Sequence, residues 1–199
     1  MAILVNKEEK RRNIACSCKE ILLEHGIKNL TISQIAKTAG VGKGTIYEYF
    51  ENKEDIVFEI ITMFIVAHEK KLQEITDKNI STKDKLFHFF YLMHEDENSH
   101  KHLNIYREFL AISMTNETQE MIDFNMKCRG KFTDILGQIV KEGIRKSEIR
   151  TEAKELVSAL LTFKLGLVIE THTAALDPKY ETTHFLDALF KLIEIKEEK

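Results

Sequence analysis

The segment that decides the fold runs from Thr31 to Lys53 and reads TISQIAKTAGVGKGTIYEYFENK. Thr31 and Gln34 form a capping-box pattern, which predicts that a helix begins at this point. The helix that follows has one apolar face, formed by Ile32, Ile35, Ala36 and Ala39. Gly40 ends this helix, and a second short helix follows it. The segment therefore predicts two short helices joined by a tight turn.

Three positions in this segment have the spacing of a helix-turn-helix. Ala36 is small where the two helices must cross, Gly40 allows a left-handed backbone in the turn, and Ile46 faces the first helix. With Ile46 and Phe50 turned inward, the second helix presents its opposite face to solvent. The residues on that face are Lys43, Gly44, Tyr47 and Glu48. A helix of this kind can enter the major groove of DNA.

The rest of the chain also reads as helices. Apolar periodicity predicts a first helix over 7–25 that Gly26 ends, and Asn52 caps a helix over 53–76. Further helices are expected at 82–93, 100–115, 117–146, 151–176 and 182–196. We expect a break at 95–99 and another at Pro178, before the last helix. A single Pro and eight Gly leave few turn signals, which favours long helices. We therefore predict an all-α fold.

Length and charge indicate two parts. A chain of 199 residues suits one medium-sized domain or two small ones. The net charge is −3, but residues 1–53 hold nine Lys or Arg against six Asp or Glu, whereas residues 54–199 hold twenty against twenty-six. A basic head on an acidic body is expected where only the head meets a polyanion. We predict a DNA-binding domain over 1–53 and a larger helical domain over 54–199.

The sequence also argues against several locations and sites. No apolar run approaches the ~18 residues of a membrane span, and residues 1–5 are too short for a signal peptide, so we expect a cytoplasmic protein with no membrane partner. Cys16, Cys18 and Cys128 fit neither a disulfide framework nor a four-ligand zinc pattern and are treated as reduced thiols. The segment 40–45 lacks the Ser or Thr that a phosphate-binding P-loop needs directly after its Lys.

The segment from Ile32 to Lys53, with the helix before it, resembles the DNA-binding domain of the TetR family of transcriptional regulators. The matching pattern is Ile32-x-x-Ile35-Ala36-x-x-Ala39-Gly40-Val41-Gly42-x-Gly44-Thr45-Ile46-Tyr47-x-Tyr49-Phe50-x-Asn52-Lys53. The remaining residues match only in being helical and of suitable length. The resemblance implies a three-helix head, a larger helical body, and a last pair of helices that packs across a two-fold axis.

Within this resemblance, five residues are expected to contact phosphates. Lys43 and Lys53 are the first candidates, because both are cations and Lys53 stands at a helix N-terminus that already favours an anion. Thr31, at the start of the preceding helix, is a further candidate. Tyr47 and Tyr49 resemble the family's aromatic pair, whose hydroxyls reach phosphates.

Three residues are expected to lie close to the bases. Gly44 allows the backbone to approach the groove floor. Thr45 offers a methyl group to a thymine and a hydroxyl to a phosphate or a base. Glu48 either accepts a hydrogen bond from cytosine N4 or points into solvent, because a carboxylate near DNA is otherwise repelled by phosphates.

The middle helices are rich in aromatic and Met residues, and the resemblance implies that such a body encloses a pocket for a small, largely apolar effector. The candidate lining residues are Phe87, Phe90, Met93, Tyr106, Phe109, Met121, Phe124, Phe163 and His172. Arg107 and Glu108 are additional polar candidates. The alternative is that these side chains form a fully packed core.

The last two predicted helices carry more apolar surface than one internal face needs. Their apolar residues include Leu156, Leu160, Phe163, Leu167, Phe185, Leu186, Leu189, Phe190, Leu192 and Ile193. We expect the surplus to bury against the same helices of a second chain. A two-fold dimer places two reading helices one DNA turn or a multiple of it apart, which predicts a palindromic operator. We expect a repressor released by its effector, with no cofactor.

Two other functions remain as alternatives. The first is a helical small-molecule-binding protein whose head no longer binds DNA. The second is a small enzyme with its chemistry at a cluster formed by His94, Glu95, Asp96, Glu97, His100 and His102. Because these residues fall in a predicted joint between helices, we expect a solvated loop there rather than a metal site, and we expect no catalytic residue.

Overall fold

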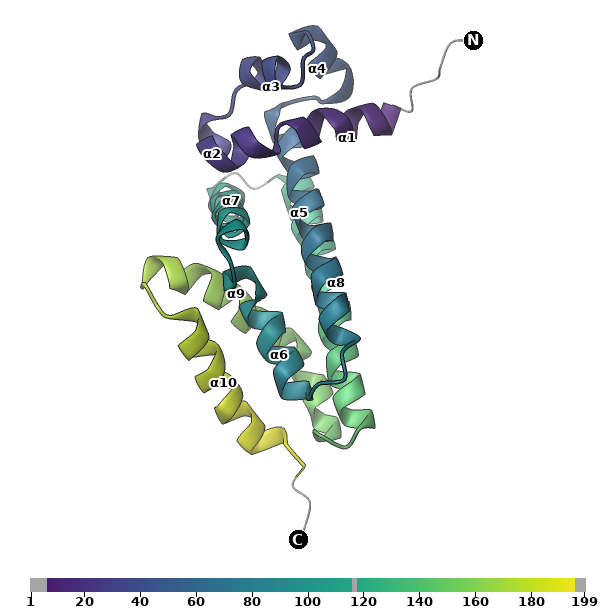
Figure 1. The fold of residues 1–199 in the computed structure, drawn as a ribbon, viewed down its shortest axis with the longest axis vertical. Helices are drawn as coiled ribbons and strands as arrows, with labels where there is room; N and C mark the ends of the chain where they lie inside the picture. Colours follow the sequence, from purple (N-terminus) through teal and green to yellow (C-terminus); the bar gives the residue numbers. More distant parts are fainter. Residues whose placement is uncertain (1–6, 116–117, 196–199) are drawn as a thin grey trace. The chain divides into compact units, whose positions relative to one another are not determined.

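The structure of this protein is a computed structural model, and it describes residues 7–115 and 118–195. These ranges contain ten α-helices, two short 3₁₀ helices and no β-strand, so the all-α prediction is confirmed. The first five helices are α1 (Lys7–Ser17), α2 (Lys19–Asn29), α3 (Ile32–Thr38), α4 (Lys43–Tyr49) and α5 (Lys53–Thr76) (Figure 1). The others are α6 (Thr82–Tyr91), η1 (Leu92–His94), α7 (Glu97–Thr115), α8 (Gln119–Arg145), η2 (Thr151–Leu156), α9 (Val157–Thr173) and α10 (Pro178–Ile193).

Compact packing divides the chain into two units. The first, called the head unit, comprises Met1–Val66 with Asn104–Glu117, and the second, called the body unit, comprises Ala67–Leu103 with Thr118–Lys199. Helices α5 and α7 therefore each contribute residues to both units. That the second half of α7 packs with the head unit does not follow from any sequence pattern. The functional division at residue 53 stays a prediction.

The core of the body unit is built around α6, which packs against α8 and α10, while α8 also packs against α9. Leu86, Phe89 and Phe90 of α6 are fully buried, as expected for a helix that is apolar nearly all round. Ser81 caps this helix by accepting a hydrogen bond from the backbone N–H of Asp84 (3.1 Å). An isolated bridge between Ile149 and Glu194 joins the residues before η2 to the end of α10.

The prediction of one helix over 7–25 is wrong in one respect. The structure has two helices there, α1 and α2, which are separated at Cys18. Cys18 leaves the helical conformation at φ −94° and ψ 0°. The Ser17 hydroxyl donates to the carbonyl of Ile14 (2.7 Å). A side-chain hydrogen bond of this kind competes with the backbone hydrogen bonds of the helix and weakens the helix at that residue. The stop predicted at Gly26 is present in the backbone, since Gly26 has φ +74° and ψ 172°.

Two later helices begin earlier than predicted. Helix α7 starts at Glu97, so the break before it is shorter than the expected 95–99. Helix α10 starts at Pro178, which is not punctuation before the helix but lies in its first turn, where its missing N–H costs nothing. Asp177 caps it by accepting hydrogen bonds from the backbone N–H groups of Lys179 (2.8 Å) and Tyr180 (2.9 Å). The predicted ends at 117 and 196, and the segment 1–5, lie outside the described residues.

One helical stretch, Thr151–Thr173, is long and apolar enough by length and composition to cross a membrane, which the sequence reading did not expect. It consists of η2 and α9. Leu160, Leu161 and Leu167 of this stretch are part of the body core, and Lys164 is buried in its middle. The core helices of globular proteins have the same composition, so the stretch by itself does not indicate a membrane protein.

Candidate nucleic-acid interface

The start of α3 and the turn after it have the predicted local chemistry. The Thr31 hydroxyl accepts a hydrogen bond from the N–H of Gln34 (3.3 Å), and the Gln34 side chain accepts one from the N–H of Thr31 (2.9 Å). This confirms the capping box. Gly40 adopts φ +66°, and the N–H of Val41 donates to the carbonyl of Ala36 (3.0 Å) across the turn. A residue with a Cβ would be strained at this φ.

The two short helices pack through the predicted residues. Ala36 of α3 and Ile46 of α4 are both buried, and α3 and α4 lie against each other (Figure 1). Phe50, directly after α4, is buried as well. Helix α4 therefore turns its Ile46 side inward, which confirms the helix-turn-helix packing.

The opposite face of α4 is open to solvent. Lys43, Gly44 and Glu48 are exposed, and 59% of Tyr47 is accessible, a large value for an aromatic side chain. Thr45 and Tyr49 are half-buried. The structure thus brings the predicted base-proximal residues and three of the predicted phosphate contacts onto one short helix. What each of them contacts stays a prediction.

The other two predicted phosphate contacts have partners within the chain. The Thr31 hydroxyl donates to Gln34 Oε1 (2.6 Å), and Lys53 Nζ donates to the carbonyl of Ile27 (3.1 Å). Asn52 caps α5 as predicted, because its Oδ1 accepts a hydrogen bond from the N–H of Asp55 (2.8 Å). Lys53 therefore stands at the start of α5 with an ammonium that retains two further N–H donors.

Arg11 holds the end of α4 in place, a role that sequence reasoning missed. Its guanidinium donates to the carbonyl of Tyr49, pairs with Asp55, and donates from Nε to Glu59 (3.1 Å). It also lies over the ring of Phe50, with Cζ 4.4 Å from the ring centroid. One side chain of α1 thus links the C-terminus of α4 to the first turns of α5. The partners are about 40 residues away from Arg11 in the sequence, so no local sequence pattern could reveal these contacts of its guanidinium.

Glu108 makes a second connection in the head unit. Its carboxylate accepts hydrogen bonds from the N–H groups of Ile27 and Lys28, both at 2.8 Å. The residue before them is Gly26, where an added Cβ would lie 2.7 Å from Glu108 Oε2. Glu108 was a candidate for an effector contact, but its carboxylate instead binds the turn at the end of α2.

The predicted effector-pocket residues are divided between the two units. Tyr106 and Phe109 belong to the head unit, where the rings of Phe109 and Phe58 meet edge to face at 5.7 Å. The remaining candidates belong to the body unit, where Phe90 is buried, His172 is exposed, and the others are buried or half-buried; these others are Phe87, Met93, Met121, Phe124 and Phe163.

Within the body unit, Phe90 and Phe163 meet in an aromatic cluster. Phe163 stacks on Phe185 of α10 with ring centroids 3.8 Å apart, and Phe90 meets both rings edge to face at 5.2 and 5.9 Å. Phe185 was assigned to the dimer face by its helical position, and its contact with Phe90 shows that it also faces inward. The part of these residues in effector binding stays a prediction.

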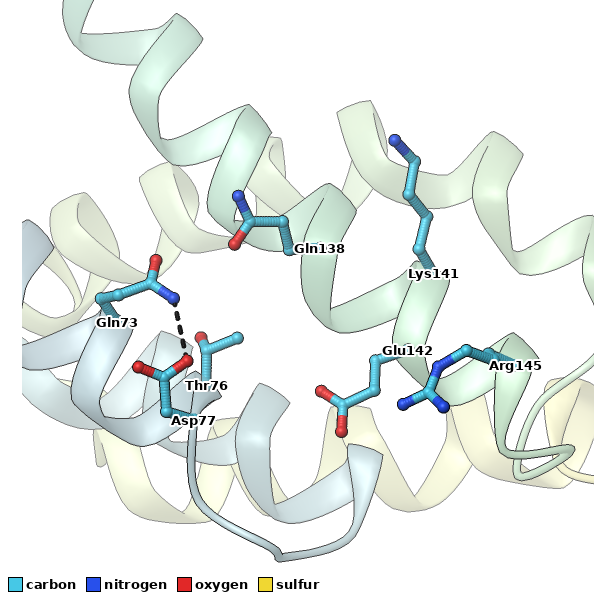
Figure 2. A pocket seen from close by; sticks show the side chains of 7 residues that line it. All are labelled: Gln73, Thr76, Asp77, Gln138, Lys141, Glu142 and Arg145. Carbon is cyan, nitrogen blue, oxygen red and sulfur yellow. Dashed lines mark hydrogen bonds between the residues drawn. The ribbon is translucent and has the colours of Figure 1, made fainter.

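The body unit has an open polar cleft of about 370 Å³ (Figure 2). Its lining residues come from α5, the residue after it, and α8; they are Gln73, Thr76, Asp77, Gln138, Lys141, Glu142 and Arg145. Hydrogen bonds from Lys146 and Lys85 keep the pKa of Glu142 below its usual range. None of the predicted pocket residues lines this cleft.

The polar cluster at 94–102 makes contacts within the protein that differ from those of a metal site. His94 is buried in η1, and His100 Nε2 lies 3.1 Å from the carbonyl of His94. Asp96 accepts a hydrogen bond from the N–H of Ser99 (2.7 Å) and pairs with Lys71 (3.8 Å). Among the residues that the structure describes, no group of three or more His, Cys, Asp or Glu side chains is placed to hold a metal ion.

The comparison with known families agrees with this geometry. A sequence model described as "Bacterial regulatory proteins, tetR family" matches residues 19–60, which include α3, the turn and α4. Residues 19–60 therefore match the DNA-binding domain of the TetR family. The match spans the buried Ala36 and Ile46 and the exposed face of α4, which are the features that set the helix-turn-helix apart from an ordinary helical pair.

Relatives of this chain are named as regulators. The chain is 28% identical to the fatty acid metabolism regulator protein of Bacillus subtilis over 193 residues, which covers 94% of this chain and 95% of the relative. It is 26% identical to the HTH-type transcriptional repressor KstR2 of Rhodococcus jostii over 148 residues, or 73% of this chain and 72% of the relative. This chain is a DNA-binding transcriptional regulator.

Solved structures agree on the fold over nearly the whole chain. The transcriptional regulator FadR of Bacillus subtilis, solved with stearoyl-CoA, matches with a TM-score of 0.61 and 26% identity, covering 89% of this chain and 96% of that one. A TetR-family regulator of Cytophaga hutchinsonii matches with a TM-score of 0.75 and 17% identity, covering 98% and 99%. The head and the body therefore both follow the fold of this family.

Proposed function

We propose that this chain is a cytoplasmic, homodimeric repressor that leaves a palindromic operator when its body binds a small, largely apolar effector. The observation that carries the proposal is the exposed face of α4, where Lys43, Tyr47 and Glu48 project from a helix anchored by Ile46. A short helix held in this way presents cations and hydrogen-bonding groups to a major groove. Nothing in this role needs a catalytic residue, a metal or a cofactor.

For the effector, we propose the class of long acyl chains. The support is the relative solved with stearoyl-CoA and the relative named for fatty acid metabolism, both of which match nearly the full chain. The aromatic and Met residues of the body suit such a ligand, because apolar and polarizable side chains adapt to an alkyl chain.

For the dimer, we propose a face on α9 and α10. Ile169 of α9 and Leu192 of α10 are 39% and 71% exposed in the single chain, and Tyr180 of α10 is 63% exposed. These residues lie on the two helices that the family resemblance assigns to dimerisation. Two-fold pairing of this face would bury their apolar surface and place two α4 helices on successive half-sites.

The proposed mechanism is a population shift. An effector that binds more tightly to the conformation in which the two heads are unsuitably spaced for the operator lowers DNA affinity by that difference in binding free energy. Helix α5 is the proposed lever, since it begins at Lys53 in the head unit and ends at Thr76 in the body unit.

The DNA-binding proposal is tested by selecting bound duplexes from a random DNA pool at several salt concentrations. The parent chain is compared with a Lys43→Ala, Tyr47→Ala variant and with Lys141→Ala, a control that removes an exposed cation from α8. We expect the parent and the control to enrich the same palindrome with a steep salt dependence, and the double variant to lose it. A parent that enriches no sequence would contradict the proposal.

The effector proposal is tested on the operator recovered in that selection. Stearoyl-CoA is added to the protein–operator complex, with free CoA as the control that lacks the acyl chain. We expect release by stearoyl-CoA and none by CoA, measured by fluorescence anisotropy of the labelled duplex. Equal responses to the two compounds would exclude acyl-chain recognition.

A further inference from the structure

Lys164 is a cation in the middle of the body core. It lies on α9, and only 6% of the residue is exposed. Its Nζ donates to the carbonyl of Phe89 on α6 (2.8 Å) and lies 3.2 Å from Nε2 of His68 on α5. The ring centroids of Phe89 and of Phe132 on α8 are 4.2 and 5.0 Å away. Three other helices thus surround this amine with two neutral hydrogen-bonding groups and two aromatic faces.

This amine has no anionic partner among the residues that the structure describes. Within residues 7–115 and 118–195, no carboxylate forms an ion pair with Lys164. The contrast is Lys85, which is 2% exposed but pairs with Glu142 (2.7 Å). Burial without a counter-charge lowers the pKa of Lys164 to about 7. The ammonium form is therefore costly in this core, and an anion brought to it would remove much of that cost.

The charged groups near this amine do not supply the missing anion. His68 has a pKa well below its usual range, because of burial and then the neighbouring charges of Lys164, Lys71 and His102, so its imidazole is neutral. Lys71 itself pairs with Asp96 (3.8 Å). The adjacent residue on α5, Glu69, is already paired with Lys131 of α8 (2.6 Å). Asp96 and Glu69 thus pair with other lysines and not with Lys164.

An aromatic residue stands next to Lys164 in the sequence, and another stands next to Phe89. Phe163 and Phe90, the chain neighbours of Lys164 and Phe89, belong to the stacked and edge-to-face cluster with Phe185. A ligand with an anionic end and an alkyl tail would match this combination of one cation and several aromatic rings. A carboxylate matches it better than a neutral acyl group, because only a charged oxygen gains the ion pair with the ammonium.

We propose that Lys164 binds the carboxylate of a free fatty acid, and that this carboxylate replaces the Phe89 carbonyl and His68 as the partner of Nζ. The proposal rests on the proposed function, in that it names the anionic end of an acyl effector. It also gives the effector a point of action on α5, because capture of Lys164 releases His68 from its 3.2 Å contact.

The test is titration calorimetry of the full-length protein without DNA, using octanoate and, as its uncharged analogue, octan-1-ol. We expect octanoate to bind at least about tenfold more tightly than octan-1-ol at pH 7, from one charge-assisted hydrogen bond. Octanoate binding at pH 8 should take up protons, seen as a heat that depends on the ionisation enthalpy of the buffer. Its affinity should fall by up to about tenfold per pH unit above pH 7, because the amine must gain a proton on binding.

The matched variants are Lys164→Met, which keeps the length of the side chain and removes its charge, and Lys141→Met, which removes an exposed charge on α8. Lys164→Met should remain folded, since an apolar side chain suits this core, and should bind octanoate and octan-1-ol equally with no proton uptake. Lys141→Met should behave as the parent does. A parent that shows no preference for octanoate, or a Lys164→Met variant that keeps it, overturns the proposal.

These outcomes are independent of the proposed function. No DNA is present in the titrations, so a failure of the protein to bind an operator leaves their result unchanged. Conversely, operator release by stearoyl-CoA together with equal binding of octanoate and octan-1-ol would support an acyl effector and reject its carboxylate contact with Lys164.

Discussion

Lys164 gives the free energy of unfolding a specific pH dependence. The pKa of this amine is about 7 in the folded chain, below its ordinary value of 10.5. The unfolded chain therefore binds more protons between these two pH values, and stability rises with pH across that window, by at most about 1.4 kcal/mol per unit. We expect Lys164→Met to be more stable than the parent at pH 6.5 and this advantage to shrink towards pH 9. Urea unfolding of both proteins at fixed concentration measures the difference, and a constant difference would contradict it.

Gly26 is a second residue with a measurable role. It has φ +74° and ψ 172°, a conformation that only Gly adopts readily, and an added Cβ would lie 2.7 Å from Glu108 Oε2. We expect Gly26→Ala to lower the free energy of unfolding by about 2–4 kcal/mol, from strain and from displaced hydrogen bonds at Ile27 and Lys28. Gly130→Ala is the control, because the exposed Gly130 lies in α8 with open space around it and should gain about 0.5–1 kcal/mol.

At the same scale, the sequence predicts the site residues whose position follows from helical periodicity. Tyr47 and Glu48 are exposed because Ile46 is buried, and one local repeat fixes all three. The hydrogen-bond partners of Thr31 and Lys53 differ in how far they can be predicted from the sequence. The Thr31 partner is three residues away and was part of the capping box, whereas Lys53 meets the Ile27 carbonyl through a tertiary contact that no local pattern encodes.

Among the elements, α4 depends on α1 through Arg11. Arg11 donates to the carbonyl of Tyr49, the last residue of α4, and to two carboxylates of α5. We expect Arg11→Met to reduce stability by about 1–3 kcal/mol and to weaken operator binding, since the end of the reading helix loses its anchor. Arg12→Met removes the neighbouring exposed cation and tests whether charge alone matters. Equal operator affinities of the two variants would show that the Tyr49 contact has no positioning role.

The elements themselves are largely predictable from sequence, and the errors have local causes. Helix α5 has the predicted bounds, because Asn52 is a strong cap and the apolar repeat continues to Thr76. The interruption at Cys18 was missed because Ser17 and Cys18 sit inside an unbroken apolar repeat, and periodicity does not report hydrogen bonds to the backbone. Pro178 lies in the first turn of α10 and not in the break before it, because proline is compatible both with a loop before a helix and with the first turn of the helix.

For the whole molecule, the proposed dimer makes a clear prediction about Leu192. This residue is 71% exposed on α10, so Leu192→Glu should leave the single chain folded while placing a charge in the proposed interface. We expect the variant to sediment as a monomer at micromolar concentration where the parent sediments as a dimer. Met126→Glu changes a similarly exposed residue, at 66%, on α8 and should remain dimeric. Dissociation of both variants, or of neither, would place the interface elsewhere.

The three cysteines differ in accessibility, and this gives the molecule a natural labelling site. Cys16 on α1 is exposed, while Cys18 and Cys128 are buried, and burial raises the pKa of both, that of Cys128 to about 11. A thiol-reactive spin label at pH 7 should therefore modify Cys16 alone, because the buried thiols are neither accessible nor ionised. In a dimer, one label per head would report the head-to-head distance by pulsed electron resonance without any engineered mutation. The distance distribution with and without acyl ligand would then show directly whether the effector changes the spacing of the two reading helices.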